Sequence, residues 1–238
     1  MNFSLIIPCY NEEKNIPLLL NKYSKFLKSN KSELILVDNG SVDGTAKVLK
    51  NINKKNVKKC FIKKNVGYGY GLKKGTMSAK GKVIIFSHAD LEVDPKDISK
   101  AINIYNKQNI KNNQKLFIKG NRINKLKNHW TISDIFFSYG LTFFSILLFR
   151  KFLFDIHGQP VLFDRKLLKE INYFPKDFSV DLSFYLHAKK NSYKIIRFPV
   201  NFNKKKRYFG EGSSDSLLKK IKASIEQSYQ SFIILNKL

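Results

Sequence analysis

Short apolar segments alternate with helix-like segments through the first half of the chain. The apolar segments cover residues 3–7, 34–37, 57–62, 82–86 and 116–119. Helix-like spacing of apolar residues lies between some of them, at residues 16–27 and 70–79. An alternation of this kind is typical of repeated βαβ units. It predicts an α/β fold with a mainly parallel sheet flanked by helices.

Each of the first four predicted strands is followed by a polar loop. In chain order these loops read PCYNEE, DNGSVDGT, NVGYG and SHADLE. Turn-forming Gly, Asp and Ser residues dominate the second loop, in which Asp43 is expected to cap the next helix. In open sheets of this type the ligand binds beyond the carboxyl ends of the strands. The four loops are therefore predicted to meet at one edge of the sheet and to form a ligand site there.

The composition excludes some classes of protein. A hydrophobic content of 43% in 238 residues supports a folded core and argues against disorder. The formal net charge is +26, but only 5 of the 44 basic residues are Arg, and the Lys residues are spread along the chain. A nucleic-acid-binding module is therefore disfavoured, whereas attraction to anionic membrane surfaces is favoured.

Cysteine usage and the first residues indicate the compartment. Cys9 and Cys60 have no metal-type spacing and do not suggest a disulfide framework, which fits a reducing cytosol. Residues 1–15 lack the basic start and long apolar core of a signal peptide, so we interpret them as folded protein. The expected location is cytoplasmic.

Two segments of the second half are apolar or amphipathic. Residues 135–149 carry no charged side chain, but these 15 residues are fewer than the roughly 20 that span a bilayer. We expect a buried or interfacial helix there. Residues 215–238 place Leu217, Leu218, Ile221 and Ile225 on one face of a basic amphipathic helix. Such a helix fits a membrane surface and packing against the sheet equally well.

A series of motifs resembles the family 2 glycosyltransferases. In chain order the motifs are SLIIPCYNEEKNI, ELILVDNGSVDGT, NVGYGYGLKKG, GKVIIFSHADLEVDP, DIHGQPVLFDRKLL and RYFGEGS. Within that family they look most like the polyprenyl-phosphate hexosyltransferases, which include the dolichyl-phosphate mannose synthases. The resemblance implies a GT-A domain over residues 1–214, followed by the amphipathic helix at 215–238. Residues 1–95 would be its nucleotide-binding half and residues 96–214 its acceptor side. The resemblance also implies inverting transfer of a hexose from a GDP- or UDP-sugar.

The resemblance assigns nucleotide contacts to the first two loops. Pro8, Tyr10 and Glu12 match the family's first nucleotide-contacting loop. Asp38 matches a carboxylate that accepts hydrogen bonds from the base or the ribose, with a turn or cap residue as the alternative. Asn39 stands where many members carry a second Asp, which keeps a polar contact and removes a charge.

The third loop is expected to face the nucleotide as well. Gly67, Gly69 and Gly71 precede or open a predicted helix, so their backbone could approach a ligand closely and the helix N-terminus could face an anion. Lys73 lies one turn into that helix and could reach toward the nucleotide, although a solvated lysine is the alternative.

A metal site is predicted in SHADLEVDP. The family usually supplies Asp-x-Asp here, where a divalent cation stabilises the charge of the leaving diphosphate. His88 replaces the first Asp, Asp90 stands at the second position and Glu92 continues the alternation, so an extended segment would project all three the same way. Oxygen ligands suit Mg²⁺ or Mn²⁺; His88 either binds the metal, hydrogen-bonds a phosphate, or marks a weakened metal site. Asp94 before Pro95 is expected to cap the next helix.

The resemblance also nominates residues on the acceptor side. Arg122 matches an Arg near the sugar or phosphate, and Arg207 and Ser213 match a loop that closes over the diphosphate. Asp181 matches an acidic residue that would take the proton of a hydroxyl acceptor, with a helix-start carboxylate as the alternative. Gln159, in DIHGQP, departs from the family's Asp-x-x-Ser-Gly and leaves the sugar and the acceptor open.

The expected function is therefore transfer of a hexose to a polyprenyl phosphate or a glycan hydroxyl, at the cytosolic face of a membrane, in cell envelope glycan biosynthesis. A sugar nucleotidyltransferase on a similar sheet is disfavoured, because its glycine-rich and Arg/Lys signature does not follow the first strand. A sugar-nucleotide-binding protein with weakened catalysis stays open because of His88. A nucleic-acid module rests on charge alone.

Overall fold

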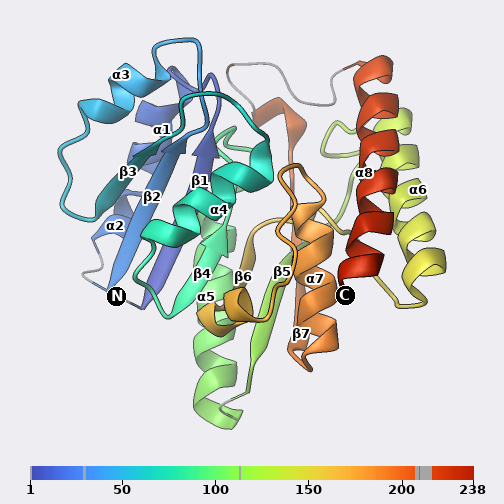
Figure 1. The fold of residues 1–238 in the computed structure, drawn as a ribbon. Coiled ribbons are helices and arrows are strands. Elements are labelled where there is room, and N and C mark those ends of the chain that lie inside the picture. The colour runs from blue at the N-terminus through green and yellow to red at the C-terminus, as the bar shows by residue number, and fades with distance from the viewer. Residues whose placement is uncertain (1, 29–30, 113, 207–208, 210–215) are drawn as a thin grey trace.

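The computed structural model describes residues 2–28, 31–112, 114–206, 209 and 216–238. The described strands form a seven-stranded sheet in the order β3-β2-β1-β4-β6-β5-β7 (Figure 1). The strands are β1 (Phe3–Cys9), β2 (Ser32–Asp38), β3 (Val57–Phe61), β4 (Val83–Phe86), β5 (Leu116–Arg122), β6 (Val161–Asp164) and β7 (Lys194–Val200). Helices flank the sheet, and the predicted α/β class is confirmed.

The sheet joins two parallel sets of strands through one antiparallel strand. β3, β2, β1 and β4 are parallel to one another, and β5 is parallel to β7. β6 runs antiparallel to β4 on one side and to β5 on the other. Because β1 has β2 on one side and β4 on the other, the strand order reverses at β1, and a crevice forms beyond the carboxyl ends there.

Helices pack two hydrophobic cores onto opposite faces of the sheet. The helices are α1 (Asn15–Lys22), α2 (Ser24–Leu27), α3 (Thr45–Lys50), α4 (Tyr68–Ser78), α5 (Pro95–Asn112), α6 (Ile132–Phe149), α7 (Val180–Lys190) and α8 (Leu217–Lys237), with short 3-10 helices at Arg165–Lys169 and Lys204–Lys206. Side chains alternate between the two faces of a strand. Leu5 and Ile7 therefore pack with α1 and α5, whereas Ile6 packs with α4 and α7.

Some local predictions hold and one does not. The Asp94 cap is confirmed, since Asp94 Oδ1 accepts a hydrogen bond from Lys96 N at 2.9 Å. Asp43 Oδ1 accepts from the backbone N of Thr45 at 2.9 Å, although the N-cap position of α3 is Gly44 and Asp43 precedes it by one residue. The single helix predicted at residues 16–27 is wrong: the backbone leaves the helical region at Tyr23, whose side chain is buried in the core.

The apolar segment of the second half forms α6, which lies beside α8 at one edge of the molecule (Figure 1). The rings of Phe144 and Phe232 join the two helices, with centroids 6.0 Å apart. A capping box opens α6, because Thr131 Oγ1 accepts from Asp134 N and the Asp134 carboxylate accepts from Thr131 N. Only 22% of α6 is buried, so the expectation of a buried helix is wrong.

Candidate active site

A cavity of about 910 Å³ opens beyond the carboxyl ends of β1, β2 and β4 and extends to α6 and α8. Ten predicted site residues line it: Pro8, Tyr10, Glu12, Asn39, Gly67, His88, Asp90, Glu92, Arg122 and Asp181. Asp38, Lys73 and Gln159 lie outside the part of its lining that the structure describes. Arg207 and Ser213 fall outside the described residues. A volume of this size is typical of small-molecule sites.

Hydrogen bonds between the first two loops shape one wall of the cavity. Glu12 N donates to Thr45 Oγ1 at 2.7 Å, and Asn11 N donates to Ser41 Oγ at 3.0 Å. Asp38 is buried, and its Oδ1 accepts from Ser41 N at 3.0 Å, so it closes the turn after β2. This is the turn role that the sequence left open for Asp38.

Asn39 connects the second loop to the third. Its Nδ2 donates to the backbone oxygen of Gly67 at 3.1 Å, a bond that an Asp carboxylate could not donate. The amide of Asn39 thus joins the two loops in a way that a carboxylate at this position could not.

The glycines of the third loop approach the protein's own backbone. Gly67 precedes α4 with φ of 124°, and a Cβ there would lie 2.4 Å from the backbone oxygen of Lys176. A Cβ at Gly69 would lie 2.2 Å from the backbone oxygen of Pro175. The need for glycine at these two positions thus comes from the segment before α7. Lys73 is exposed on α4.

The segment after β4 turns sharply. Leu91 is buried with φ of 65°, and Asp90 Oδ1 accepts from Glu92 N at 3.1 Å. The expectation of an extended segment with three parallel side chains is therefore wrong, because the chain bends between Asp90 and Glu92. The His88 ring stacks on Tyr68 at 5.1 Å. Among the described residues, no group of three or more His, Cys, Asp or Glu side chains is arranged to hold a metal ion.

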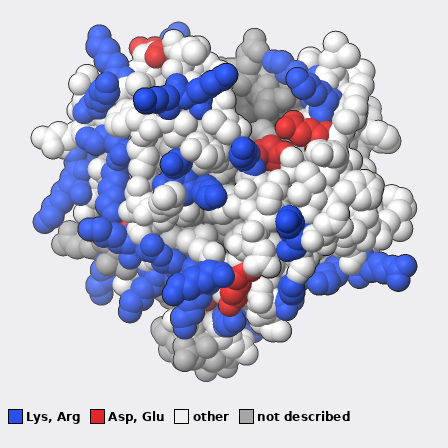
Figure 2. All heavy atoms as spheres, in the orientation of Figure 1, with Lys and Arg blue, Asp and Glu red and all other residues white. Residues whose placement is uncertain are grey.

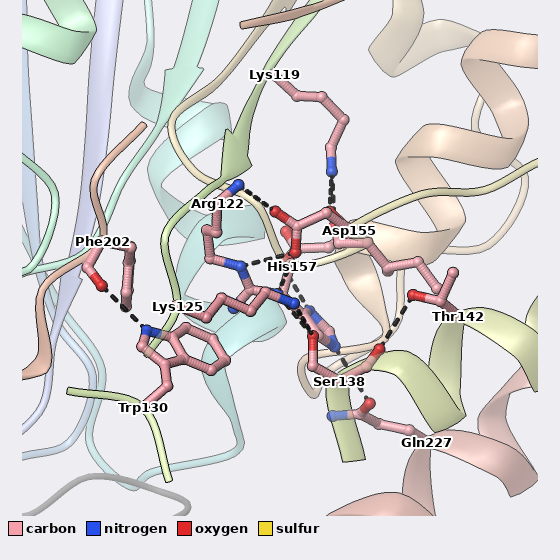
Figure 3. A network of polar contacts seen from close by, with 12 residues as sticks. Lys119, Arg122, Lys125, Trp130, Ser138, Thr142, Asp155, His157, Phe202 and Gln227 are labelled. Atoms are coloured by element: carbon pink, nitrogen blue, oxygen red, sulfur yellow. Dashed lines mark hydrogen bonds and ion pairs between the residues drawn. The ribbon is translucent and has the colours of Figure 1, made fainter. Parts of the chain in front are cut away.

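A buried ion pair anchors the cavity wall that contains Arg122 (Figure 3). Asp155 accepts from Arg122 Nη2, from Arg122 Nε at 2.7 Å and from Arg122 N at 2.6 Å. Burial acts to raise the pKa of Asp155, but the charge and hydrogen bonds of Arg122, together with Lys119, lower it to about 2. Lys119 donates to the backbone oxygens of Asp155 and Ile156, and burial lowers its pKa to about 8.

Trp130 is surrounded by cationic side chains on the same wall. Arg122 Cζ lies 4.7 Å from its ring centroid, Lys204 Nζ 5.2 Å and Lys125 Nζ 5.3 Å. The Trp130 Nε1 donates to the backbone oxygen of Phe202 at 3.0 Å (Figure 3). This wall therefore presents an aromatic surface flanked by positive charge.

Asp134 holds two of the cavity's lysines together. Lys204 Nζ and Lys220 Nζ each lie 2.8 Å from its carboxylate oxygens. Burial acts to raise the pKa of Asp134, but hydrogen bonds from both lysines and from Thr131 hold it well below its usual range. One carboxylate therefore fixes α6, α8 and the Lys204–Lys206 turn around the cavity with a surplus of positive charge.

His157 and Asp181 pair in the cavity lining. The His157 Nδ1 lies 3.0 Å from Asp181 Oδ2, and its Nε2 lies 3.2 Å from Gln227 Oε1 of α8. Gln159 Nε2 donates to the other Asp181 oxygen at 3.2 Å. Both Asp181 oxygens are thus hydrogen-bonded, and the Asp181 side chain is only 5% exposed.

Sequence reasoning missed several cavity residues. Trp130, Asp134, Lys204 and Lys220 carried no motif signal, because their partners are distant in sequence. The quoted segment DIHGQP does contain Asp155 and His157. The presence of His157 two residues after Asp155 in this motif was the sequence signal that could have identified both residues.

Comparisons with known proteins agree with one another. The family model described as glycosyl transferase family 2 matches residues 4–172. A dolichyl-phosphate beta-glucosyltransferase of Dictyostelium discoideum is 28% identical over 218 residues, covering 84% of this chain and 65% of that protein. The undecaprenyl-phosphate 4-deoxy-4-formamido-L-arabinose transferase of Proteus mirabilis is 36% identical over 104 residues, 42% of this chain and 32% of that protein. The chain thus spans less than two thirds of the length of these relatives.

Solved structures share the fold. Glucosyl-3-phosphoglycerate synthase from Mycobacterium tuberculosis, in complex with Mn²⁺, UDP and phosphoglyceric acid, superposes with a TM-score of 0.69 at 15% identity. The match covers 98% of this chain and 77% of that one.

One sequence relative matches over nearly its whole length. An uncharacterized protein of Methanocaldococcus jannaschii is 31% identical over 229 residues, which cover 91% of this chain and 93% of that protein.

Proposed function

The chain belongs to glycosyl transferase family 2 and has a GT-A fold, and we propose that it transfers a hexose from a nucleoside-diphosphate sugar to a polyprenyl phosphate. One observation carries this proposal: a single cavity brings the loops after β1, β2 and β4 together with a cationic wall and two apolar helices. The loops suit a nucleotide, the cations suit a phosphate, and the helices suit a lipid chain. The named relatives act on dolichyl or undecaprenyl phosphates, which supports this acceptor class.

On the donor side, we assign the nucleoside to the wall formed by Pro8, Tyr10, Glu12 and Asn39, as part of a donor half at residues 1–95. Asp90 would face the diphosphate. One carboxylate together with substrate phosphates is a common way for proteins to bind Mg²⁺ or Mn²⁺, so Asp90 fits such a cation without a further protein cluster. The cation would stabilise charge on the leaving diphosphate. The structural relative with Mn²⁺ and UDP supports a divalent cation.

The transfer step requires an acceptor oxygen opposite the leaving group. That oxygen attacks the anomeric carbon while the bond from this carbon to the diphosphate breaks, and the electron pair leaves with the nucleoside diphosphate. Attack from the opposite side inverts the anomeric centre. A phosphate acceptor is already ionised and needs no strong base; Arg122, Lys204 and Lys220 line the cavity where its charge would be held.

A glycan hydroxyl is a second acceptor that one observation favours. His157 and Asp181, 3.0 Å apart, have the geometry of a base held by a carboxylate. A hydroxyl would displace Gln227 Oε1 from His157 Nε2 and lose its proton to this nitrogen during attack, with Asp181 orienting the ring through Nδ1–H. In the phosphate reaction the same His157 would hold a phosphate oxygen. We assign these acceptor contacts to residues 96–214 together with the helix at 215–238, acting at the cytosolic face of a membrane.

The experiment is a donor and acceptor panel. GDP- and UDP-sugars are incubated with the protein, with and without Mn²⁺, and with either an extracted polyprenyl phosphate or a glycan. Nucleoside diphosphate release that depends on the polyprenyl phosphate is expected. Release only with the glycan selects the hydroxyl acceptor, and binding without release indicates weakened catalysis. Neither binding nor release across the panel overturns the proposal.

A further inference from the structure

Lys119 is buried in a chain that carries many of its basic side chains on the surface. Blue Lys and Arg side chains spread over the face of the molecule that Figure 2 shows. Lys119, in β5, is only 1% exposed and follows the buried Phe117 and Ile118. In the part of the chain that the structure describes, its Nζ bonds to no carboxylate. A buried ammonium group is costly unless other groups hold it.

Two backbone oxygens and an aromatic ring hold the ammonium group of Lys119. Its Nζ donates to the backbone oxygen of Asp155 and, at 3.2 Å, to that of Ile156 (Figure 3). The ring centroid of Tyr185, in α7, lies 5.0 Å from Nζ. Asp155 and Ile156 are the two residues that precede His157. Lys119 is therefore bound to the backbone that carries the His157 ring.

Other groups of β5 also hold the segment at residues 155–158. Asp155 has φ of 49°, a backbone conformation that residues with a side chain rarely adopt. Its carboxylate accepts from Arg122 N at 2.6 Å and from Arg122 Nε at 2.7 Å. A Cβ at Gly158 would lie 2.1 Å from the backbone oxygen of Gly120. A strained backbone of this kind persists only where surrounding contacts fix it, and β5 supplies these contacts.

The charge of Lys119 depends on its surroundings. Burial lowers its pKa to about 8; two nearby carboxylates act in the opposite direction, and two guanidinium groups lower it further. The charged and titratable groups that face it are Asp155, Asp181, Arg122, Arg197 and Tyr185. Between about pH 8 and the ordinary lysine pKa, the unfolded chain binds the proton and the folded chain does not. Protonation of Lys119 thus disfavours folding, which indicates a role at the site.

Lys119 can affect the cavity through His157. Lys119 lies outside the part of the cavity lining that the structure describes, whereas His157 belongs to it. Asp181 Oδ2 and Gln227 Oε1 fix the two ring nitrogens of His157, at 3.0 and 3.2 Å. The position of the ring depends equally on the backbone before it, which Lys119 holds at two consecutive oxygens. Small displacements of a group that contacts a reactant strongly reduce binding or rate.

We propose that Lys119 is a positioning residue, whose ammonium group binds the Asp155 and Ile156 oxygens and so holds the His157 ring where it meets the acceptor. This ring would hold an oxygen of a phosphate acceptor or take the proton of a hydroxyl acceptor. The contact with the acceptor rests on the proposed function, whereas the hold of Lys119 on His157 does not. Loss of the Lys119 proton above about pH 8 would weaken this hold and the binding of the acceptor.

¹H–¹³C NMR spectra of the His rings test the hold of Lys119 on His157. Lys119→Met keeps an unbranched side chain and removes its donors, whereas the control Lys115→Met removes an equal charge at a more exposed site just before β5. The His157 signals, assigned by their loss in His157→Gln, should shift in Lys119→Met and stay in place in Lys115→Met. In the wild type they should move as the pH passes through about 8, and Lys119→Met should lack this change.

Kinetics test the consequence for the acceptor. Nucleoside diphosphate release is measured with a short-chain, water-soluble polyprenyl phosphate. Lys119→Met should raise the acceptor KM about tenfold and leave the donor KM nearly unchanged. The double variant Lys119→Met/His157→Gln should be no worse than His157→Gln alone, because both changes remove the same contact. A merely structural role of Lys119 would raise both KM values or add its effect to that of His157→Gln.

The outcomes that overturn the proposal differ from those that overturn the proposed function. Unchanged His157 signals in Lys119→Met, an unchanged acceptor KM, or an equal rise in both KM values overturns the role of Lys119. If Lys119→Met does not fold, the wild-type titration decides, and His157 signals that stay in place as the pH passes through about 8 overturn it. Absence of turnover in the wild type counts against the proposed function alone, and the NMR spectra then decide on Lys119.

Discussion

The proposed donor side and the proposed acceptor side of the cavity are built in different ways. The donor-side loops follow consecutive parallel strands and are joined by hydrogen bonds from backbone N–H groups to side-chain oxygens, such as Glu12 N to Thr45 Oγ1. The acceptor side is held by ion pairs between side chains, such as Arg122 with Asp155 and Lys220 with Asp134. The donor side thus depends on hydrogen bonds from the backbone, and the acceptor side depends on individual charged contacts.

The largest expected effect concerns the donor side. Asp90→Ala should reduce the transfer rate by about a thousandfold or more, since the leaving diphosphate loses its protein-held cation. Nucleoside diphosphate release at saturating donor measures it, and thermal unfolding should be little changed. The control Asp97→Ala removes a carboxylate at the start of α5 and should retain the rate. An undiminished rate in Asp90→Ala would remove Asp90 from the site.

Loss of an acceptor-side charge should affect stability as well as activity. Asp155→Asn is expected to lower the free energy of unfolding by about 3 kcal/mol, because Arg122 and Lys119 would remain buried without their anion. Urea unfolding measures the loss. Glu170→Gln is the matched control, since its pair with Lys115 is more exposed and should contribute less than about 1 kcal/mol. Equal losses would contradict the contrast between the two sides.

Lowering the pH should remove the stabilisation from the Arg122–Asp155 ion pair without a mutation. The pKa of Asp155 is lowered from its ordinary value of 3.8 to about 2 in the folded chain. Its stabilisation is therefore fully present above about pH 4 and is lost as the pH falls toward about 2. The expected loss is about 2 kcal/mol in the free energy of unfolding. Urea titrations across that range measure it, and Asp155→Asn should show a weaker pH dependence than the wild type.

A smaller effect should separate acceptor from donor binding. His157→Gln is expected to raise the acceptor KM about tenfold while the donor KM changes little, because His157 faces the acceptor side. A merely structural role would move both constants or neither. His129→Gln, at an exposed His outside the described cavity lining, is the control. A fall in kcat alone, with both KM values unchanged, would favour a hydroxyl acceptor and a base role.

The smallest expected effect tests the capping box of α6, a local sequence signal in the second half of the chain. Thr131→Ala removes the capping box of α6 and should lower the free energy of unfolding by about 1 kcal/mol. Thr131→Ser keeps the accepting hydroxyl and should behave like the wild type. If Thr131→Ala were neutral, tertiary contacts such as the Asp134 ion pairs would hold the start of α6 without the capping box.

The contrast between the two sides also explains what the sequence could predict. The strands at residues 3–7 and 34–37 and the Asp94 cap follow from periodicity and turn chemistry, which act over a few residues. The antiparallel strand β6 follows from pairing with β4 and β5, which no local pattern encodes. The extended segment expected for His88, Asp90 and Glu92 was wrong because the chain bends at Leu91. A leucine with positive φ has no sequence signature.

For the cavity, motif resemblance found ten lining residues but not the chemistry between them. Asp181 was expected to act on the acceptor, and nothing in its own segment indicates that His157 pairs with it. Likewise, Asp134 links α6 to the rest of the cavity wall only through its ion pairs with Lys204 and Lys220. Such contacts arise from tertiary packing, and a single sequence does not contain them as a pattern.

The position of β6 has a consequence for how the chain is made. Among the described strands, β6 alone connects the β3-β2-β1-β4 set to the β5-β7 pair. During synthesis, residues 1–86 can complete four parallel strands while β4 still presents an unpaired edge. β5 leaves the ribosome before β6 and has no partner in the sheet until residues 161–164 follow. The nascent chain is therefore most exposed to wrong strand pairing in this interval, when chaperone protection has the most to contribute.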